Sequence, residues 1–252
     1  MLASLRPTIE KAVANLPAQV RFRAQNSLEG FRRARILLSV DREIASFRAI
    51  TAEEEAAAAL FRALQLRKYP GADALSLRMH HHKAAAGFFL AVLARSLSRG
   101  LEIRINLTVQ VDPPAITIGL PVNQFSKLKD APPEYQIVLS DPLGLLHNRE
   151  GVSPSEIFDD AVKEAAGDAN VDRLIAKAAN ARNTILYAHD SGVPRSQVTE
   201  KGIDARQRNA DVMLILATAV LQTDVHQPMA LQSLQGFLKV LKRTGSDIEA
   251  TT

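Results

Sequence analysis

Residues 47–60 read FRAITAEEEAAAAL, and this stretch points to a helical protein. Its glutamates and its run of alanines favour a helix, and Thr51-Ala52-Glu53-Glu54 has the spacing of a capping box. We therefore predict that a helix begins at Thr51 and ends near Lys68, before the Tyr69-Pro70-Gly71 turn. The three glutamates, residues 53–55, are expected to be solvated helix charges.

Helical patterns continue on both sides of this stretch. No proline occurs between residues 18 and 69, and the residues before Thr51 place apolar side chains as a long helix does. Another helix is expected from residues 77–80 to Gly100, because glycine favours the position just after a helix. Later in the chain we expect four further helices, at residues 153–167, 168–189, 203–221 and 228–241.

The middle of the chain has the pattern of strands. Leu101–Val111 (LEIRINLTVQV) alternates apolar and polar residues with a period of two, which is typical of a half-buried strand. Ala115–Leu120 and Tyr135–Leu139 are two further strand candidates. The predicted fold class is therefore mainly α, a helical bundle with a small antiparallel β-sheet insertion. We expect an N-terminal helical half (1–100), a β-rich insertion (101–150) and a C-terminal helical half (151–252), with the two halves forming one bundle.

The composition excludes several functional classes. The chain has 252 residues, with 31 Lys and Arg against 27 Asp and Glu, and it contains no cysteine. A disulfide scaffold, a zinc finger, an iron–sulfur cluster and thiol catalysis are therefore excluded. No apolar run reaches the roughly 18 residues of a membrane span, and the first residues lack the apolar block of a signal peptide. We expect a cytoplasmic protein without a membrane partner.

Positive charge is concentrated in residues 21–48, which hold seven arginines and three acids. Such a stretch can contact phosphates, and the alternative is a long helix with a solvated polar face. The candidates for RNA contact are Arg21, Arg23, Arg32, Arg33 and Arg35.

Three consecutive histidines, His80 to His82, suggest a metal site at first sight. Successive residues of a helix point about 100° apart, however, so three in a row cannot converge on one ion. We predict a helix start there, and neither a metal nor another cofactor.

The segment DANVDRLIAKAANARNTILYAH (residues 168–189) places two polar groups on an apolar stripe. On a helical wheel both Arg182 and His189 point from the middle of this stripe. A cation there is costly unless it is paired or faces a wet cleft. Either Arg182 pairs with a buried acid, for which one of residues 53–55 is a candidate, or Arg182 and His189 converge on a phosphate. The stripe consists of Val171, Ile175, Ala178, Ile185 and Leu186.

Arg182-Asn183, followed by five residues and His189 near the end of a helix, resembles the signature of the HEPN superfamily (higher eukaryotes and prokaryotes nucleotide-binding). In that signature an arginine is followed after four to six residues by a histidine, and often directly by a polar residue. Phe47–Leu60 is also similar to the second helix of such proteins, including abortive-infection members. The strand insertion at 101–140 is not part of the common pattern.

The resemblance implies metal-independent RNA cleavage through attack of the 2′-hydroxyl. Arg182 would bind the scissile phosphate and His189 would transfer protons. Asn183 would orient the histidine or the phosphate, and Tyr187 would support the site by stacking or hydrogen bonding, or serve in packing.

The resemblance also implies a symmetric homodimer that acts on RNA as a toxin or an antiviral effector. An antitoxin or a nucleotidyltransferase is a candidate further partner. Two alternatives stay open. One is a non-catalytic helical module that binds a nucleotide, a nucleic acid or a protein. The other is a purely structural helical protein with Arg182 ion-paired inside.

Overall fold

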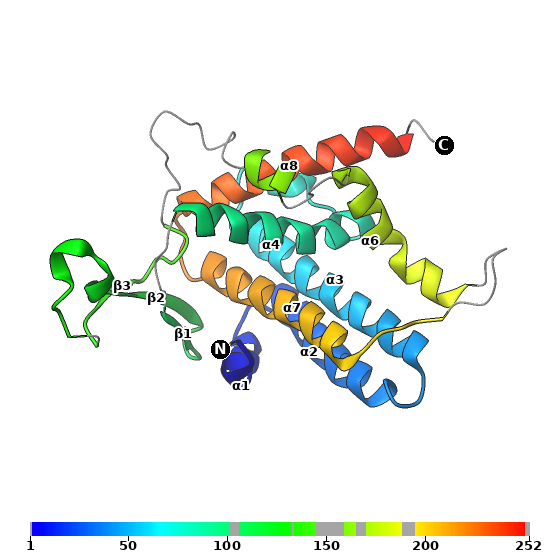
Figure 1. Cartoon of the computed structure of the whole chain (residues 1–252), viewed down its shortest axis with the longest axis horizontal. Helices are drawn as coiled ribbons and strands as arrows, with labels where there is room; N and C mark the ends of the chain where they lie inside the picture. The colour runs from blue at the N-terminus through cyan, green and yellow to red at the C-terminus, as the bar shows by residue number, and fades with distance from the viewer. Residues whose placement is uncertain are drawn as a thin grey trace.

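The computed structural model describes residues 2–100, 106–132, 134–144, 159–164, 170–187 and 195–249. In these residues the predicted fold class is confirmed, because long helices surround a core and three short strands form an antiparallel sheet (Figure 1). The helices are α1 (Leu2–Ala14), α2 (Ala18–Leu37), α3 (Arg42–Leu66), α4 (His80–Gly100), α6 (Val171–Leu186), α7 (Glu200–Leu221) and α8 (Pro228–Glu249), and residues 159–164 are also helical. The strands are β1 (Asn106–Gln110), β2 (Ala115–Pro121) and β3 (Gln136–Leu139).

Helix α3 lies at the centre of the bundle and contacts α2, α4, α6 and α7. Its alanine run, residues 56–59, is buried along its whole length, so neighbouring helices approach α3 from several sides. A side chain on Gly30 of α2 would place its Cβ only 2.7 Å from the Cβ of Ala52. Small residues therefore allow α2 and α3 to pack at short range.

The helix break predicted at Thr51 is wrong. Helix α3 begins earlier, after Asp41, whose carboxylate accepts a hydrogen bond from the backbone of Ile44 at 2.9 Å. Thr51 lies inside the helix, and its hydroxyl donates to the carbonyl of Arg48 at 3.0 Å. The hydroxyl of Thr51 therefore has a hydrogen-bond partner although no helix begins there.

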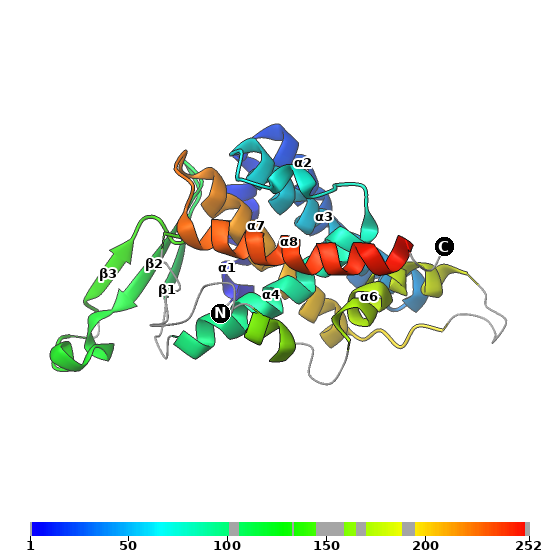
Figure 2. The ribbon, with the colours of Figure 1, turned by 90° about the horizontal axis from the view of Figure 1, so that it is seen from above.

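The three strands form a sheet at one end of the bundle, in the order β1-β2-β3 (Figures 1 and 2). In the β1–β2 pair Asn106 lies opposite Gly119. Gln222, the residue after α7, ties the sheet to the bundle: its Oε1 accepts from the backbone N–H of Ile116 at 2.7 Å, and its Nε2 donates to the carbonyl of the same residue at 3.1 Å. Ile116 is 1% exposed, whereas Val138 on the outer strand is 65% exposed, so the sheet is anchored on its inner side.

The predicted ends of the other helices are mostly close to the observed ones. Helix α4 begins at His80, within the predicted range, and it includes Gly100, which was predicted to lie just after its end. Helix α7 begins three residues before the predicted Ile203, because the hydroxyl of Thr199 accepts a hydrogen bond from the backbone of Gly202 at 3.2 Å. Helix α8 continues to Glu249, beyond the predicted Leu241. Residues 101–105, 153–158 and 165–169 of predicted elements lie outside the described residues.

Candidate functional site

Helix α6 carries the predicted arginine motif and packs against α3 and α4 (Figure 2). Its cap is Asn170, whose side-chain oxygen accepts from the backbone N–H of Asp172 at 2.8 Å. Residue 168, where this helix is predicted to begin, lies outside the described residues. The helix ends at Leu186, earlier than the predicted end near His189.

The apolar stripe predicted for this helix is buried only in part. Ile175 is 2% exposed and anchors the N-terminal half of α6. Towards the C-terminal end Ala178 is exposed, and Leu186 is 36% exposed. Arg182 is partly buried, so it lies at the edge of the packed face of the helix and not in the middle of a sealed stripe.

The guanidinium of Arg182 lies over an aromatic ring of α3. Its Cζ is 6.0 Å from the centroid of the Phe47 ring, a distance typical of a weak cation–π contact. Among the residues that the structure describes, no carboxylate forms an ion pair with this guanidinium. The interpretation in which Arg182 pairs with one of residues 53–55 is therefore wrong.

Asn183 and Tyr187 lie on the exposed side of the same helix end, and Tyr187 is 64% exposed. The backbone N–H of Tyr187 donates to the carbonyl of Asn183 at 3.2 Å. The amide of Asn183 and the phenol of Tyr187 are thus exposed to solvent, and both residues are close to Arg182 in the sequence. His189 lies outside the described residues.

Glu54 of α3 contacts His80 and Lys83 of α4, and in this cluster Glu54 and Lys83 are buried whereas the His80 side chain is 40% exposed. Oε2 of Glu54 lies 2.9 Å from Nδ1 of His80 and 3.3 Å from Nζ of Lys83. Glu54 is 5% exposed and Lys83 is 7% exposed, so the prediction of a solvated carboxylate is wrong for Glu54. The sequence signal that we missed is a lysine just before the apolar stretch AAAGFFL, because a cation on a buried helix face needs an acid nearby.

The three consecutive histidines have separate environments. His80 contacts Glu54, whereas Nδ1 of His82 accepts a hydrogen bond from the backbone N–H of Ser76 at 3.0 Å. Burial lowers the pKa of both His81 and His82, and the adjacent histidine contributes in the same direction. Within the described part of the chain no three His, Cys, Asp or Glu side chains are grouped as metal ligands.

The arginines predicted to contact RNA lie on α2 and have local partners. Arg32 and Arg33 both donate to Glu29, with Nε–Oε distances of 2.7 Å. These two hydrogen bonds, the one from Arg32 first, lower the pKa of Glu29 to about 2. Arg21 and Arg23 donate to backbone carbonyls at 3.4 and 2.9 Å. The segment is therefore a partly neutralised helix surface rather than a row of free cations.

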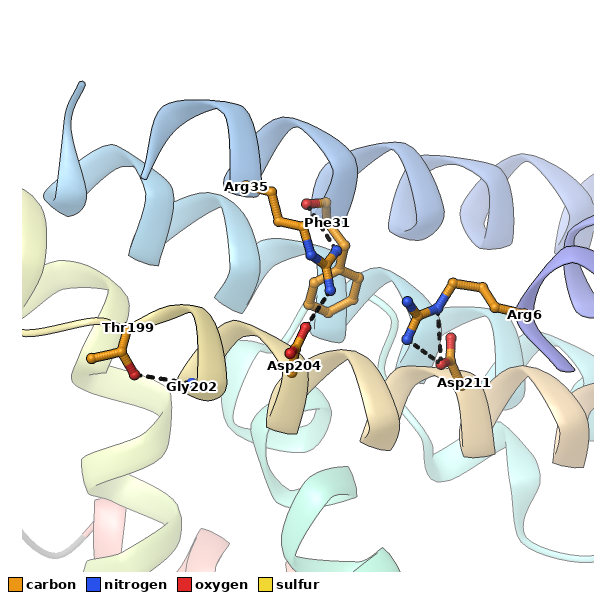
Figure 3. Close-up of polar contacts among 7 residues, drawn as sticks. All are labelled: Arg6, Phe31, Arg35, Thr199, Gly202, Asp204 and Asp211. Atoms are coloured by element: carbon orange, nitrogen blue, oxygen red, sulfur yellow. Dashed lines mark hydrogen bonds and ion pairs between the residues drawn. The ribbon is translucent and has the colours of Figure 1, made fainter. Parts of the chain in front are cut away.

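Two arginines connect their helices to α7 (Figure 3). Arg35 of α2 donates to Oδ1 of Asp204 at 2.5 Å. Arg6 of α1, which the sequence did not single out, donates through Nε and Nη2 to Oδ2 of Asp211 at 3.3 and 3.2 Å. Burial raises the pKa of Asp211, and the charge of Arg6 offsets this only in part.

Comparisons of this chain with protein-family models, with curated proteins and with solved structures find no match. Among the described residues, no helix combines the length and the apolar composition that crossing a bilayer requires. The functional inference therefore depends on the side chains themselves, and above all on the partners that each charged group has.

Proposed function

We propose that this protein is a metal-independent endoribonuclease of the HEPN type, in which Arg182 binds the scissile phosphate. The state of its guanidinium carries the proposal: it lies over the Phe47 ring, is partly buried, and has no acidic partner in the described part of the chain. A guanidinium forms two parallel hydrogen bonds with a phosphate, and such charge-assisted bonds are among the strongest in proteins. An anionic ligand would supply the partner that the described residues do not give to this arginine.

In the proposed reaction the 2′-hydroxyl of the RNA attacks the adjacent phosphorus and loses its proton. The bond between phosphorus and the 5′-oxygen breaks, and that oxygen gains a proton. The products carry a 2′,3′-cyclic phosphate and a 5′-hydroxyl. Arg182 would offset the charge that develops on the phosphate oxygens.

The remaining roles belong to the other residues of the motif. His189 is the proton-transfer group that the motif predicts, because an imidazole changes its charge near neutral pH. The exposed Asn183 would orient the phosphate or the histidine, and the exposed Tyr187 would stack on a base.

The proposal includes a symmetric homodimer. One copy of the motif supplies a single arginine and a single histidine, whereas the reaction uses both an acid and a base. Two copies of α6 facing each other across the RNA would supply both. The proposed biological role is that of a cytoplasmic toxin or antiviral effector, held in check by an antitoxin or a nucleotidyltransferase.

The test uses the full chain, a labelled single-stranded RNA and EDTA. We expect the wild-type protein to cleave the RNA and leave 2′,3′-cyclic phosphate ends. His189→Ala should lower the rate by about 100-fold or more, as expected for loss of a general acid or base. His226→Ala, which changes an exposed histidine on another part of the chain, is the matched control and should retain the activity.

Absence of cleavage in EDTA, or equal cleavage by the His189→Ala protein, would contradict the proposal. RNA binding that weakens steeply with salt but is never followed by cleavage would favour the non-catalytic binding module instead.

A further inference from the structure

The two edges of the three-stranded sheet differ in how they are covered. Helix α1 packs against β1, and Nδ2 of Asn15, just after α1, donates to the carbonyl of Val111, just after β1, at 2.9 Å. At the other edge β3 pairs with β2, and no further strand of the described residues follows it. Figures 1 and 2 show β3 projecting away from the helices. The outer edge of β3 is therefore open in the part of the chain that the structure describes.

The backbone groups of β3 point alternately towards β2 and away from it. The carbonyl of Tyr135 accepts from the backbone N–H of Val122, just after β2, at 2.9 Å, so Tyr135 faces β2 with its backbone. In an antiparallel pair this direction alternates from residue to residue. Ile137 therefore also faces β2 with its backbone, whereas Gln136 and Val138 face the open side. The outer edge offers their N–H and C=O groups to a further strand.

The side chains of β3 do not protect this edge. Val138 is 65% exposed and Ile137 is 44% exposed. Since neighbouring residues of a strand point to opposite faces, apolar side chains are exposed on both faces of β3. The strand Gln136–Leu139 (QIVL) contains no charged residue and no proline, the residues that commonly prevent further pairing at an edge. Such an edge is a site to which another strand can add.

The sequence around β3 is complementary to itself. In a two-fold antiparallel pairing centred on Val138, this valine lies opposite Val138 of the partner subunit. Ile137 then lies opposite Leu139 of the partner subunit, and Gln136 lies opposite Ser140 of the partner subunit. Apolar side chains thus meet apolar ones, and polar side chains meet polar ones. The backbone groups of Val138 face outwards, so the two central valines exchange two hydrogen bonds.

We propose that β3 pairs with β3 of a second copy of this chain, so that the two sheets join into one continuous sheet. The pairing is isologous, because the same strand is used on both copies. Backbone hydrogen bonds and the burial of Ile137 and Val138 stabilise it. Figure 1 shows β3 and α6 at opposite ends of the molecule. The contact is therefore separate from the pairing of α6 in the proposed function, and it does not depend on ribonuclease activity.

The first test measures self-association of the full chain by sedimentation velocity over a series of concentrations. Val138→Lys and Val40→Lys are a matched pair, because both valines are exposed, Val40 by 83%. Val40 lies in the turn between α2 and α3, which Figure 1 shows at the other end of the molecule from the sheet. Val138→Lys places like charges opposite each other and should raise the dissociation constant at least about tenfold. Val40→Lys should leave it within about twofold.

The second test uses single cysteines, because the chain contains none of its own. In the proposed register the Cα atoms of the two residues 138 are about 5.5 Å apart, a separation that a disulfide spans. Those of the two residues 137 are about 8 Å apart, which is too far. Mild oxidation should therefore link the Val138→Cys protein into covalent dimers. Ile137→Cys and Val40→Cys should each give at most about a tenth as much dimer.

Three results would overturn the proposal. One is a wild-type protein that stays monomeric at every concentration. Another is an oligomer that is as stable in the Val138→Lys protein as in the wild type, which would place the contact elsewhere, for example at α6. The third is covalent dimer formation by Ile137→Cys or Val40→Cys that equals that of Val138→Cys. If Val138→Lys does not fold, the cysteine variants decide, because they introduce no charge into the strand.

Discussion

The two sides of α3 hold their charges in different ways. On the side of α7, Glu53 accepts from Nη1 of Arg206 at 2.5 Å and from Nδ2 of Asn209 at 2.8 Å. On the side of α4 and α6, Glu54 is buried with its own partners, whereas Arg182 lies over the ring of Phe47 and forms no ion pair with a described carboxylate. The same helix therefore contacts charges that are fixed in pairs and one, Arg182, that has no acidic partner among the described residues.

We use this difference to distinguish charged side chains that stabilise the fold from a charged side chain that is available to a ligand. A charge that is paired across two helices holds them in one arrangement, and breaking the pair leaves its partner uncompensated. An arginine at the edge of a packed face holds no such arrangement, because water already solvates part of it. Such an arginine can therefore bind a ligand with little effect on the free energy of unfolding. The predictions below test this separation in order of decreasing effect on stability.

The largest loss of stability is expected for Glu54→Leu. This change leaves the ammonium of Lys83 buried without its carboxylate, and the free energy of unfolding should fall by about 3–5 kcal/mol. The double variant Glu54→Leu/Lys83→Met removes both charges and should recover most of this loss. Urea unfolding checks both, with Glu55→Gln as control. A loss below about 1 kcal/mol for the single variant would show that the cluster is not a buried pair in solution.

The next effect depends on pH and concerns Asp211. Because burial raises the pKa of this carboxyl in the folded state, the folded protein binds a proton that the unfolded chain releases at the same pH. Its contribution to stability is therefore complete below the unfolded pKa and is lost as the pH rises through the folded pKa. Relative to Asp211→Asn, the wild type should therefore gain stability as the pH is lowered from neutral towards the ordinary pKa of an aspartate. Parallel urea curves at several pH values measure this difference. A constant difference would refute the prediction.

A smaller effect is expected for Asp204→Asn. The side chains of Arg35 and Asp204 are 30% and 42% exposed, so water screens their ion pair. The loss should be about 1 kcal/mol or less, as for other solvent-exposed pairs. A loss of unfolding free energy as large as that of Glu54→Leu would mean that solvent exposure does not predict how much an ion pair stabilises this protein.

The smallest effect on stability is expected for Arg182→Ala. The contact of Arg182 with the Phe47 ring is weak, and its loss leaves no described carboxylate without a partner, so the free energy of unfolding should change by about 0.5 kcal/mol. Arg173→Ala, an exposed arginine of the same helix, is the matched control. Thermal or urea unfolding of the two proteins should give nearly the same result, and a large loss for Arg182→Ala alone would assign Arg182 a structural role.

Much of the fold follows from local patterns. The alternation in Leu101–Val111 predicted a strand whose described part is β1, and the apolar run before Gly100 predicted α4. The capping-box pattern at Thr51 predicted a helix start wrongly, because the Thr51 hydroxyl can also donate a hydrogen bond to a backbone carbonyl inside a continuous helix. Local sequence cannot distinguish these two outcomes, which depend on packing against α2.

The candidate site was harder to predict, because partners far apart in the sequence decide the state of each charge. The helical wheel of residues 168–189 placed Arg182 on the packed side of α6. It could not show that the apolar stripe is partly exposed from Ala178 onwards. It also could not show that Glu54 forms an ion pair with Lys83, 29 positions further along the chain.

The central claim is that Arg182 serves a ligand and not the fold, and RNA cleavage by folded Arg182→Ala and Arg173→Ala proteins tests it most directly. We expect the first to lose about 100-fold or more of the wild-type rate, as when a group that stabilises transition-state charge is removed, and the second to keep nearly all of it. Equal rates for both proteins, with both folded, would contradict the account.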